Sequence, residues 1–185
     1  MAIQRYIPRL VKLHLWLSNP CMKLYLLRHA EAAEGSPDAE RPLTRKGIEQ
    51  SKAIGRFLAA RKTRFDAVFT SPLVRAVETT EWVLEVLGDS KKGVKIQKTD
   101  ALLNDATTHE FDAWLKKLTA FKKVLMVGHN PSLSLHLARW LQTRSPVSVT
   151  LPKGGLAVVK WDGPQAVLKL FITPKQTGFL DDDEE

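Results

Sequence analysis

A chain of 185 residues, 44% of them hydrophobic, suits a single domain with a sizeable core. Its one cysteine excludes a disulfide within this chain and a cysteine-based metal cluster, and nothing in the sequence calls for a metal or another cofactor. The formal net charge of +8 favours anionic ligands, but without an arginine-rich tract we expect no nucleic-acid partner.

The two ends of the chain differ from its middle. Residues 1–21 carry basic but no acidic residues and precede the first predicted strand, so we interpret them as an N-terminal extension. A weak amphipathic pattern over 6–17 leaves a short membrane-surface helix as the alternative. The acidic tail, 179–185, leaves 22–178 as the one predicted domain. No stretch is long and apolar enough for a membrane span, and the cysteine content agrees with a cytoplasmic location.

The first predicted element is a strand over residues 24–27, an unbroken apolar run that is too short for a helix. A run without alternation is typical of a strand buried on both faces of a sheet. Arg28 and His29 follow directly, and ligands of open α/β sheets bind at the carboxyl ends of strands. A cation and a possible nucleophile therefore stand where a binding site is expected.

The next elements alternate between helix and strand. A loop over 30–42 leads to Thr44, a good N-cap for a helix in which Gly47 and Gly55 permit close contact with a neighbour. A second strand follows, and then a helix that Pro72 favours in its first turn and that Gly88 ends.

The second half of the chain completes the pattern. Its predicted elements are an edge strand at 94–97, a connector at 101–108, a helix at 110–118, a strand at 123–127, a helix to about residue 141, and strands at 156–161 and 166–172 joined by a hairpin turn at 162–165. The strand at 123–127 is as apolar as the first and should also be central. We therefore predict an α/β fold, a three-layer α/β/α sandwich with a mostly parallel sheet and a C-terminal antiparallel hairpin.

Residues that could bind and transfer phosphate follow three of the strands. They are Arg28, His29, Arg75 and His129. If the strands are parallel neighbours, two guanidiniums can clamp a tetrahedral dianion while one neutral imidazole attacks phosphorus and the other stabilises its oxygens.

Each of these residues also has a purely structural interpretation. A single histidine is more often part of a core, and Arg75 could pair with Glu78 or Glu81 on its own helix. We expect no catalytic role for His14, His109 or His136, which lack such a context.

The motifs around these residues resemble the histidine phosphatase (phosphoglycerate mutase-like) superfamily, and in particular its SixA-type phosphohistidine phosphatases. They are Leu-Arg-His-Ala-Glu at 27–31, Arg-Pro-Leu-Thr-Arg-Lys-Gly at 41–47, Ser-Pro-Leu-Val-Arg-Ala-Val-Glu-Thr at 71–79 and Val-Gly-His-Asn-Pro at 127–131. The resemblance implies that His29 is the phosphorylated nucleophile and that Arg28, Arg75 and His129 complete its phosphate pocket. Ala30 replaces the usual glycine after the histidine, and we expect activity to survive this change.

The resemblance also bears on the substrate. SixA-like members generally lack a clear general acid, and Asp105 is the only carboxylate in the corresponding loop, 102–108. A site without a dedicated acid suits an imidazole leaving group better than an alkoxide. We therefore predict a metal-independent phosphatase that acts on phosphohistidine of a protein through a phosphorylated His29, with an acidic surface on its partner. The alternatives are a phosphomonoesterase or pyrophosphatase of small phosphorylated substrates, with Asp105 as the acid, and a catalytically silent phosphate-binding module.

Overall fold

The structure is a computed structural model that describes residues 21–88, 94–163 and 165–180. The strands are β1 (Met22–Arg28), β2 (Ala67–Thr70), β3 (Ile96–Lys98), β4 (Lys123–Gly128), β5 (Leu156–Trp161) and β6 (Ala166–Ile172). The helices are α2 (Arg45–Ala60), α3 (Val74–Leu87), α4 (Thr108–Leu115) and α5 (Ser132–Trp140). Short 3-10 turns are η1 (Asp38–Glu40), η3 (Asp100–Leu102), η4 (Lys116–Leu118), η5 (Pro146–Val149) and η6 (Lys175–Thr177).

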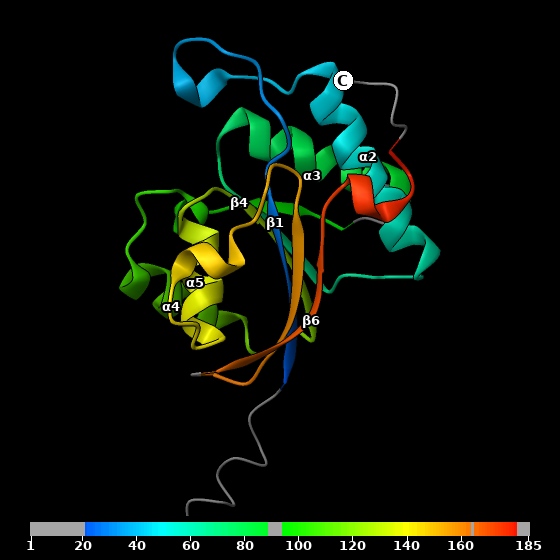
Figure 1. Cartoon of the computed structure of the whole chain (residues 1–185). Coiled ribbons are helices and arrows are strands. Elements are labelled where there is room, and N and C mark those ends of the chain that lie inside the picture. Colours follow the sequence, from blue (N-terminus) through cyan, green and yellow to red (C-terminus); the bar gives the residue numbers. More distant parts are fainter. Residues whose placement is uncertain (1–20, 89–93, 164, 181–185) are drawn as a thin grey trace, which may run out of the picture.

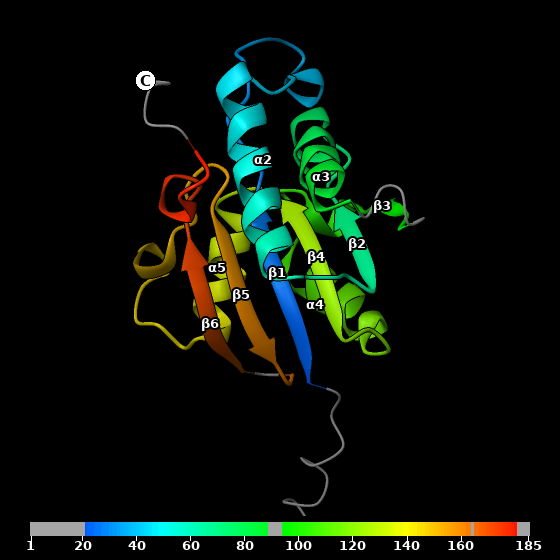
Figure 2. The ribbon, with the colours of Figure 1, turned by 90° about the vertical axis from the view of Figure 1, so that its right-hand side faces the viewer.

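The strands form one sheet in the order β3-β2-β4-β1-β5-β6 (Figure 2). The pairs within β3-β2-β4-β1 are parallel, whereas β5 pairs antiparallel with both β1 and β6. The central places of β1 and β4 and the hairpin of β5 and β6 confirm the predicted arrangement, although its turn includes residue 164, which is not described. β3 is an edge strand as predicted, but it lies slightly later in the chain than 94–97.

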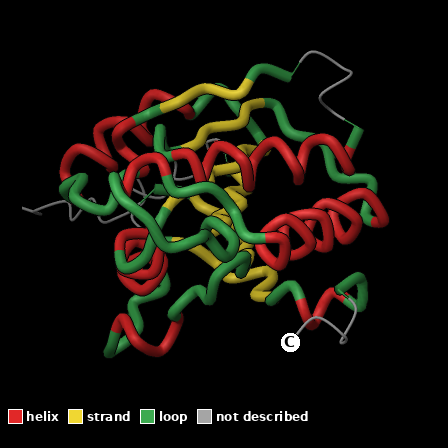
Figure 3. The backbone as a smooth tube through the Cα atoms, turned by 90° about the horizontal axis from the view of Figure 1, so that it is seen from above, coloured by secondary structure: helices red, strands yellow, loops and turns green. Residues whose placement is uncertain are grey.

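Helices cover both faces of this sheet (Figures 1 and 3). On one face α2 and α3 pack against the sheet, and Leu27, Ile54 and Val83 belong to one buried cluster. On the other face lie α4 and α5, whose Phe111 and Trp140 belong to a second buried cluster. The predicted three-layer α/β/α sandwich is confirmed.

Individual residues determine where α2 begins, where α3 ends and where these two helices pack closely. The Thr44 side chain accepts a hydrogen bond from the Gly47 N–H at 3.0 Å, which confirms it as the N-cap of α2. Gly88 ends α3 with a left-handed φ of 73°. A Cβ on Gly55 would lie 2.9 Å from the Cβ of Val86, so the close contact predicted for this glycine is with α3.

Two helix starts differ from the predictions. α3 begins after Leu73, not at Pro72, because the Ser71 hydroxyl accepts a hydrogen bond from the Leu73 N–H at 3.3 Å and forms a turn there. α4 begins after Thr107, which forms a capping box with the glutamate three residues on. His109 therefore lies in α4, whereas the predicted helix began only at residue 110.

Most of the N-terminal extension, with the alternative helix over 6–17, and the five acidic residues at the end of the chain lie outside the described residues. Among the helices that the structure does describe, none combines the length and the apolar character that crossing a bilayer requires.

Candidate active site

The carboxyl ends of β1, β4 and β2 lie side by side because these strands are parallel neighbours. Arg28 pairs in register with Gly128, and Thr70 pairs with Val127. The backbone N–H of His29 donates to the carbonyl oxygen of Gly128 at 2.9 Å. Segments far apart in the sequence therefore meet at one edge of the sheet, which is the arrangement that the motifs required.

A cavity of about 440 Å³ lies at this edge, and His29, Arg75 and His129 all line it. Its other lining residues are Asp38, Leu73, Leu103, Asn104, Asp105 and Asn130. Arg28, the fourth predicted phosphate ligand, does not line the cavity. Three of the four predicted site residues and the candidate acid Asp105 thus share one solvent-accessible space.

The backbone holds His29 in one tautomer. Its Nδ1 lies 2.7 Å from the carbonyl oxygen of Ala30, and because a carbonyl can only accept, Nδ1 carries the ring proton. Nε2 then keeps its lone pair. Burial, followed by the positive charges of Arg75 and Arg28, lowers the pKa of His29 to about 4. Near neutral pH the ring is therefore uncharged and nucleophilic.

His129 stands beside His29, with 5.0 Å between the ring centroids. Its Nε2 is 2.8 Å from the Ser71 hydroxyl, which also accepts from the Leu73 N–H. The Nδ1 of His129 is a buried atom with no hydrogen-bond partner among the described residues. Burial and the neighbouring charges of His29 and Arg75 lower the pKa of His129 to about 3. His129 is therefore an uncharged imidazole near neutral pH.

Arg75 belongs to the first turn of α3, and its side chain is only 9% exposed. Its Nη1 donates to the backbone oxygen of Asp38 at 2.6 Å, and its Nη2 donates to the Asp38 carboxylate at 2.9 Å. The ion-pair partner of Arg75 is therefore Asp38 and not Glu78 or Glu81. Glu78 instead accepts a hydrogen bond from the Leu43 N–H at 2.6 Å.

Arg28 is held beside the cavity by the segment before β5. Its Nη1 donates to the carbonyl oxygen of Leu151 at 3.0 Å, and the Asn130 side chain donates to the same oxygen at 2.6 Å. Its Nε is buried and has no hydrogen-bond partner within the described part of the chain. The positive charge of Arg28 is one of the smaller contributions that lower the pKa of His29 and His129.

Comparisons with known proteins agree with this geometry. Residues 24–105 match the family described as the histidine phosphatase superfamily, branch 1. An uncharacterised protein of Picosynechococcus is 34% identical over 117 residues, which make up 60% of this chain and 68% of that protein. The chain belongs to the histidine phosphatase superfamily.

Within this superfamily the chain is of the SixA type. The phosphohistidine phosphatase SixA of Escherichia coli is 27% identical to this histidine phosphatase over 164 residues, 80% of this chain and 98% of that protein. The crystal structure of a SixA protein from Agrobacterium tumefaciens has a TM-score of 0.71 at 26% identity, and the match covers 83% of this chain and 98% of that one. The chain is accordingly a phosphatase.

The site of this histidine phosphatase includes residues that the sequence motifs did not assign. Ser71 follows β2 as His29 follows β1, and that shared position was the available signal. Asn130 follows His129 directly and could have been considered with it. Asp38 gave no signal, because it is one of several acidic residues in a loop without periodicity.

The remaining histidines of the phosphatase lie elsewhere. His136 is 3% exposed and stacks on Phe111, with 3.8 Å between ring centroids. Neither it nor His109 lines the cavity, and His14 lies outside the described residues. Within the described ranges, no group of three His, Cys, Asp or Glu side chains is placed to hold a metal ion.

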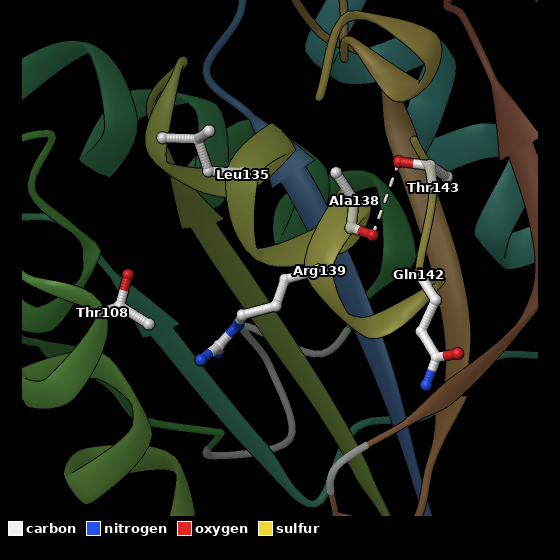
Figure 4. Close-up of a pocket in the computed structure, with 6 residues that line it drawn as sticks. All are labelled: Thr108, Leu135, Ala138, Arg139, Gln142 and Thr143. Carbon is white, nitrogen blue, oxygen red and sulfur yellow. Dashed lines mark hydrogen bonds between the residues drawn. The ribbon is translucent and has the colours of Figure 1, made fainter. Parts of the chain in front are cut away.

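A second cavity of about 450 Å³ lies beside α5 and the residues that follow it (Figure 4). Its lining residues are Thr108, Leu135, Ala138, Arg139, Gln142 and Thr143. The charged group, Arg139, is paired with the Asp112 carboxylate at 2.7 Å. None of the predicted site residues lines this cavity, so the candidate site is the cavity that contains His29 and His129.

Proposed function

We propose that this chain removes the phosphoryl group from phosphohistidine of a protein, through a covalent intermediate on His29. The observation that carries the proposal is the tautomer of His29, because the hydrogen bond from Nδ1 to Ala30 leaves Nε2 free in the cavity shared with Arg75 and His129. Neutral imidazole with a free lone pair is the form that attacks phosphorus.

The proposed reaction has two steps. In the first, Nε2 of His29 forms a bond to phosphorus while the bond from phosphorus to the substrate imidazole breaks, and that imidazole takes up a proton from solvent. In the second, a water oxygen forms a bond to phosphorus while the bond to Nε2 of His29 breaks and the ring regains its lone pair. Inorganic phosphate leaves with one proton of the water, and the other proton returns to solvent. Arg75, Arg28 and His129 would balance the negative charge on the phosphoryl oxygens in both steps.

The leaving group is the reason to favour a P–N bond. Asp38 and Asp105 are the carboxylates that line the cavity. Hydrogen bonds from Arg41 and Arg75 hold the pKa of Asp38 below its ordinary value, so Asp38 is a poor proton donor. A protonated imidazole leaves without the help that a strongly basic alkoxide requires.

The accessibility of the cavity and the net charge of the chain indicate what kind of partner it would bind. The short connections around the cavity leave it accessible to a side chain of another protein, and the net charge of +8 favours an acidic surface on that protein. We retain residues 22–178 as the proposed catalytic unit, and a cytoplasmic location stays a prediction.

Trapping of the phosphoenzyme tests the proposal. Wild-type protein mixed with a phosphohistidine protein should acquire acid-labile phosphate, and His29→Ala should acquire none. His109→Ala is the matched control because the same change is made at an exposed position outside the cavity, and it should be labelled like wild type. Label retained by His29→Ala would contradict the proposal.

A second candidate is a phosphomonoesterase of small molecules, favoured by the presence of Asp105 in the same cavity. Comparing kcat/KM for a phosphohistidine peptide with that for sugar phosphates and nucleotides separates the two functions. If Asp105 is the acid, Asp105→Asn should reduce turnover of the monoesters by about a hundredfold or more. If the first proposal holds, the same variant should turn over phosphohistidine nearly as well as wild type.

A further inference from the structure

The loop over residues 34–40 is closed at its base and exposed along its length. At the base, the Ala33 N–H donates to the Pro42 carbonyl oxygen at 2.9 Å, and Ala32 pairs with Leu43 in a β-bridge. Every residue of the 34–40 loop is exposed. The loop thus buries little apolar surface, and polar contacts decide where its far end lies.

The contact that joins this end of the loop to the cavity is that of Asp38 with Arg75. Asp38 accepts from both outer nitrogens of the guanidinium, once with its backbone oxygen and once with its carboxylate. The two acceptors together occupy the pair of guanidinium nitrogens to which a phosphoryl group could offer two of its own oxygens. In this structure the anion on Arg75 is therefore a side chain of the protein itself.

The two partners differ in their freedom to move. The Arg75 side chain is 9% exposed and fixed in α3, whereas the Asp38 side chain is 63% exposed on the 34–40 loop. Arg41, at the base of the loop, holds the other carboxylate oxygen at 2.9 Å and donates to the Ala33 carbonyl oxygen at 2.7 Å. Asp38 can therefore leave Arg75 and remain close to it on Arg41.

We propose that Asp38 is an intramolecular ligand of the anion site, displaced from Arg75 by the phosphoryl group of the substrate and returning to Arg75 as inorganic phosphate leaves. The inference rests on the proposed role of Arg75 as a phosphate ligand. Its functional consequence is a lowered affinity for every anion, because part of the binding free energy is used to displace Asp38. A substrate protein has further contacts that offset this loss, whereas free phosphate has none, so the product does not accumulate on the enzyme.

Equilibrium binding of inorganic phosphate, measured by calorimetry, tests the inference without requiring turnover. Asp38→Asn should bind phosphate about fivefold more tightly than wild type, the size expected when one ion pair no longer competes. Product inhibition by phosphate should strengthen by the same factor. Asp38→Ala should behave alike, which excludes an effect specific to the amide.

Glu40→Gln is the matched control. It removes the same charge from the same turn, η1, but Glu40 does not line the cavity, so phosphate affinity should change by less than about twofold. Thermal unfolding of each variant confirms that the fold is retained. An equal effect of Asp38→Asn and Glu40→Gln would overturn the inference, since general charge would then explain it. Weaker binding by Asp38→Asn would also overturn it, since Asp38 would then position Arg75.

Arg75→Ala separates this inference from the proposed function. If Arg75→Ala binds phosphate as wild type does, Arg75 is not a phosphate ligand and both proposals fail. If Arg75→Ala loses phosphate while Asp38→Asn does not gain it, the phosphate pocket stands and only the displacement of Asp38 is wrong.

Discussion

The buried His136 should make the fold sensitive to acid. It lies on α5, stacked on Phe111 of α4, and its Nδ1 has no hydrogen-bond partner among the described residues. Burial, with a smaller contribution from the positive charge of Arg139, lowers the pKa of His136 to about 4. In the unfolded chain the same ring titrates near 6.5.

The sign and size of the effect follow from these two pKa values. Between them the unfolded chain binds more protons than the folded chain, so the free energy of unfolding falls as the pH falls from about 6.5 to about 4. The full loss corresponds to about 3 kcal/mol, of which about 2 kcal/mol is lost between about pH 7 and about pH 5. The burial of His29 and His129 acts in the same direction.

Replacement of the ring tests this calculation. His136→Leu removes the titrating group and puts an apolar side chain in its place. The change in unfolding free energy between about pH 7 and about pH 5 should therefore be about 2 kcal/mol smaller in the variant than in wild type. Urea unfolding followed by tryptophan fluorescence measures both values. His109→Leu, on the exposed surface of α4, is the matched control and should keep the wild-type pH dependence. An unchanged pH dependence in His136→Leu would refute the reasoning.

Other measurements address the site and the fold. Because the pKa of His29 lies near 4, kcat/KM for p-nitrophenyl phosphate should decline only as the pH falls toward that value, and a decline centred near 6.5 would contradict the neutral nucleophile. Ser71→Ala should remove the hydrogen bond to Nε2 of His129, which nitrogen chemical shifts of that ring detect, and lower kcat about tenfold; unchanged shifts would contradict the contact. Thr44→Ala should cost about 1 kcal/mol of unfolding free energy in urea, whereas no loss would mean that its hydrogen bond to Gly47 is not stabilising.

The sequence predicted the buried elements of the fold better than the exposed ones. The apolar runs of β1 and β4 predicted two central strands because a strand covered on both faces needs no polar residues. The edge strand β3 was placed slightly too early, because a short strand with exposed lysines has little hydrophobic pattern to mark its ends. The start of α3 was missed because the Ser71 turn competes with the helix-starting preference of Pro72.

The candidate site could be predicted only in part, because the sequence indicates which residues follow buried strands but not the path of exposed loops. His29 and His129 directly follow strands, and parallel strands bring their carboxyl ends together, so the sequence predicted their proximity. Asp38 could not be found, because its position depends on the path of an exposed loop that no periodicity encodes. Nothing in the sequence indicated that the Arg28 side chain donates to the carbonyl oxygen of Leu151, because the two residues are 123 positions apart.

The register between β1 and β4 sets the distance between the two imidazoles. Each strand ends one position before its histidine, and the two strands pair residue by residue up to that point. Loss of one residue inside either strand would turn its histidine toward the opposite face of the sheet. Changes in length among the connecting segments leave this pairing intact. Insertions and deletions in the loops around the cavity can therefore accumulate without moving the two imidazoles apart, provided that the lengths of β1 and β4 stay constant.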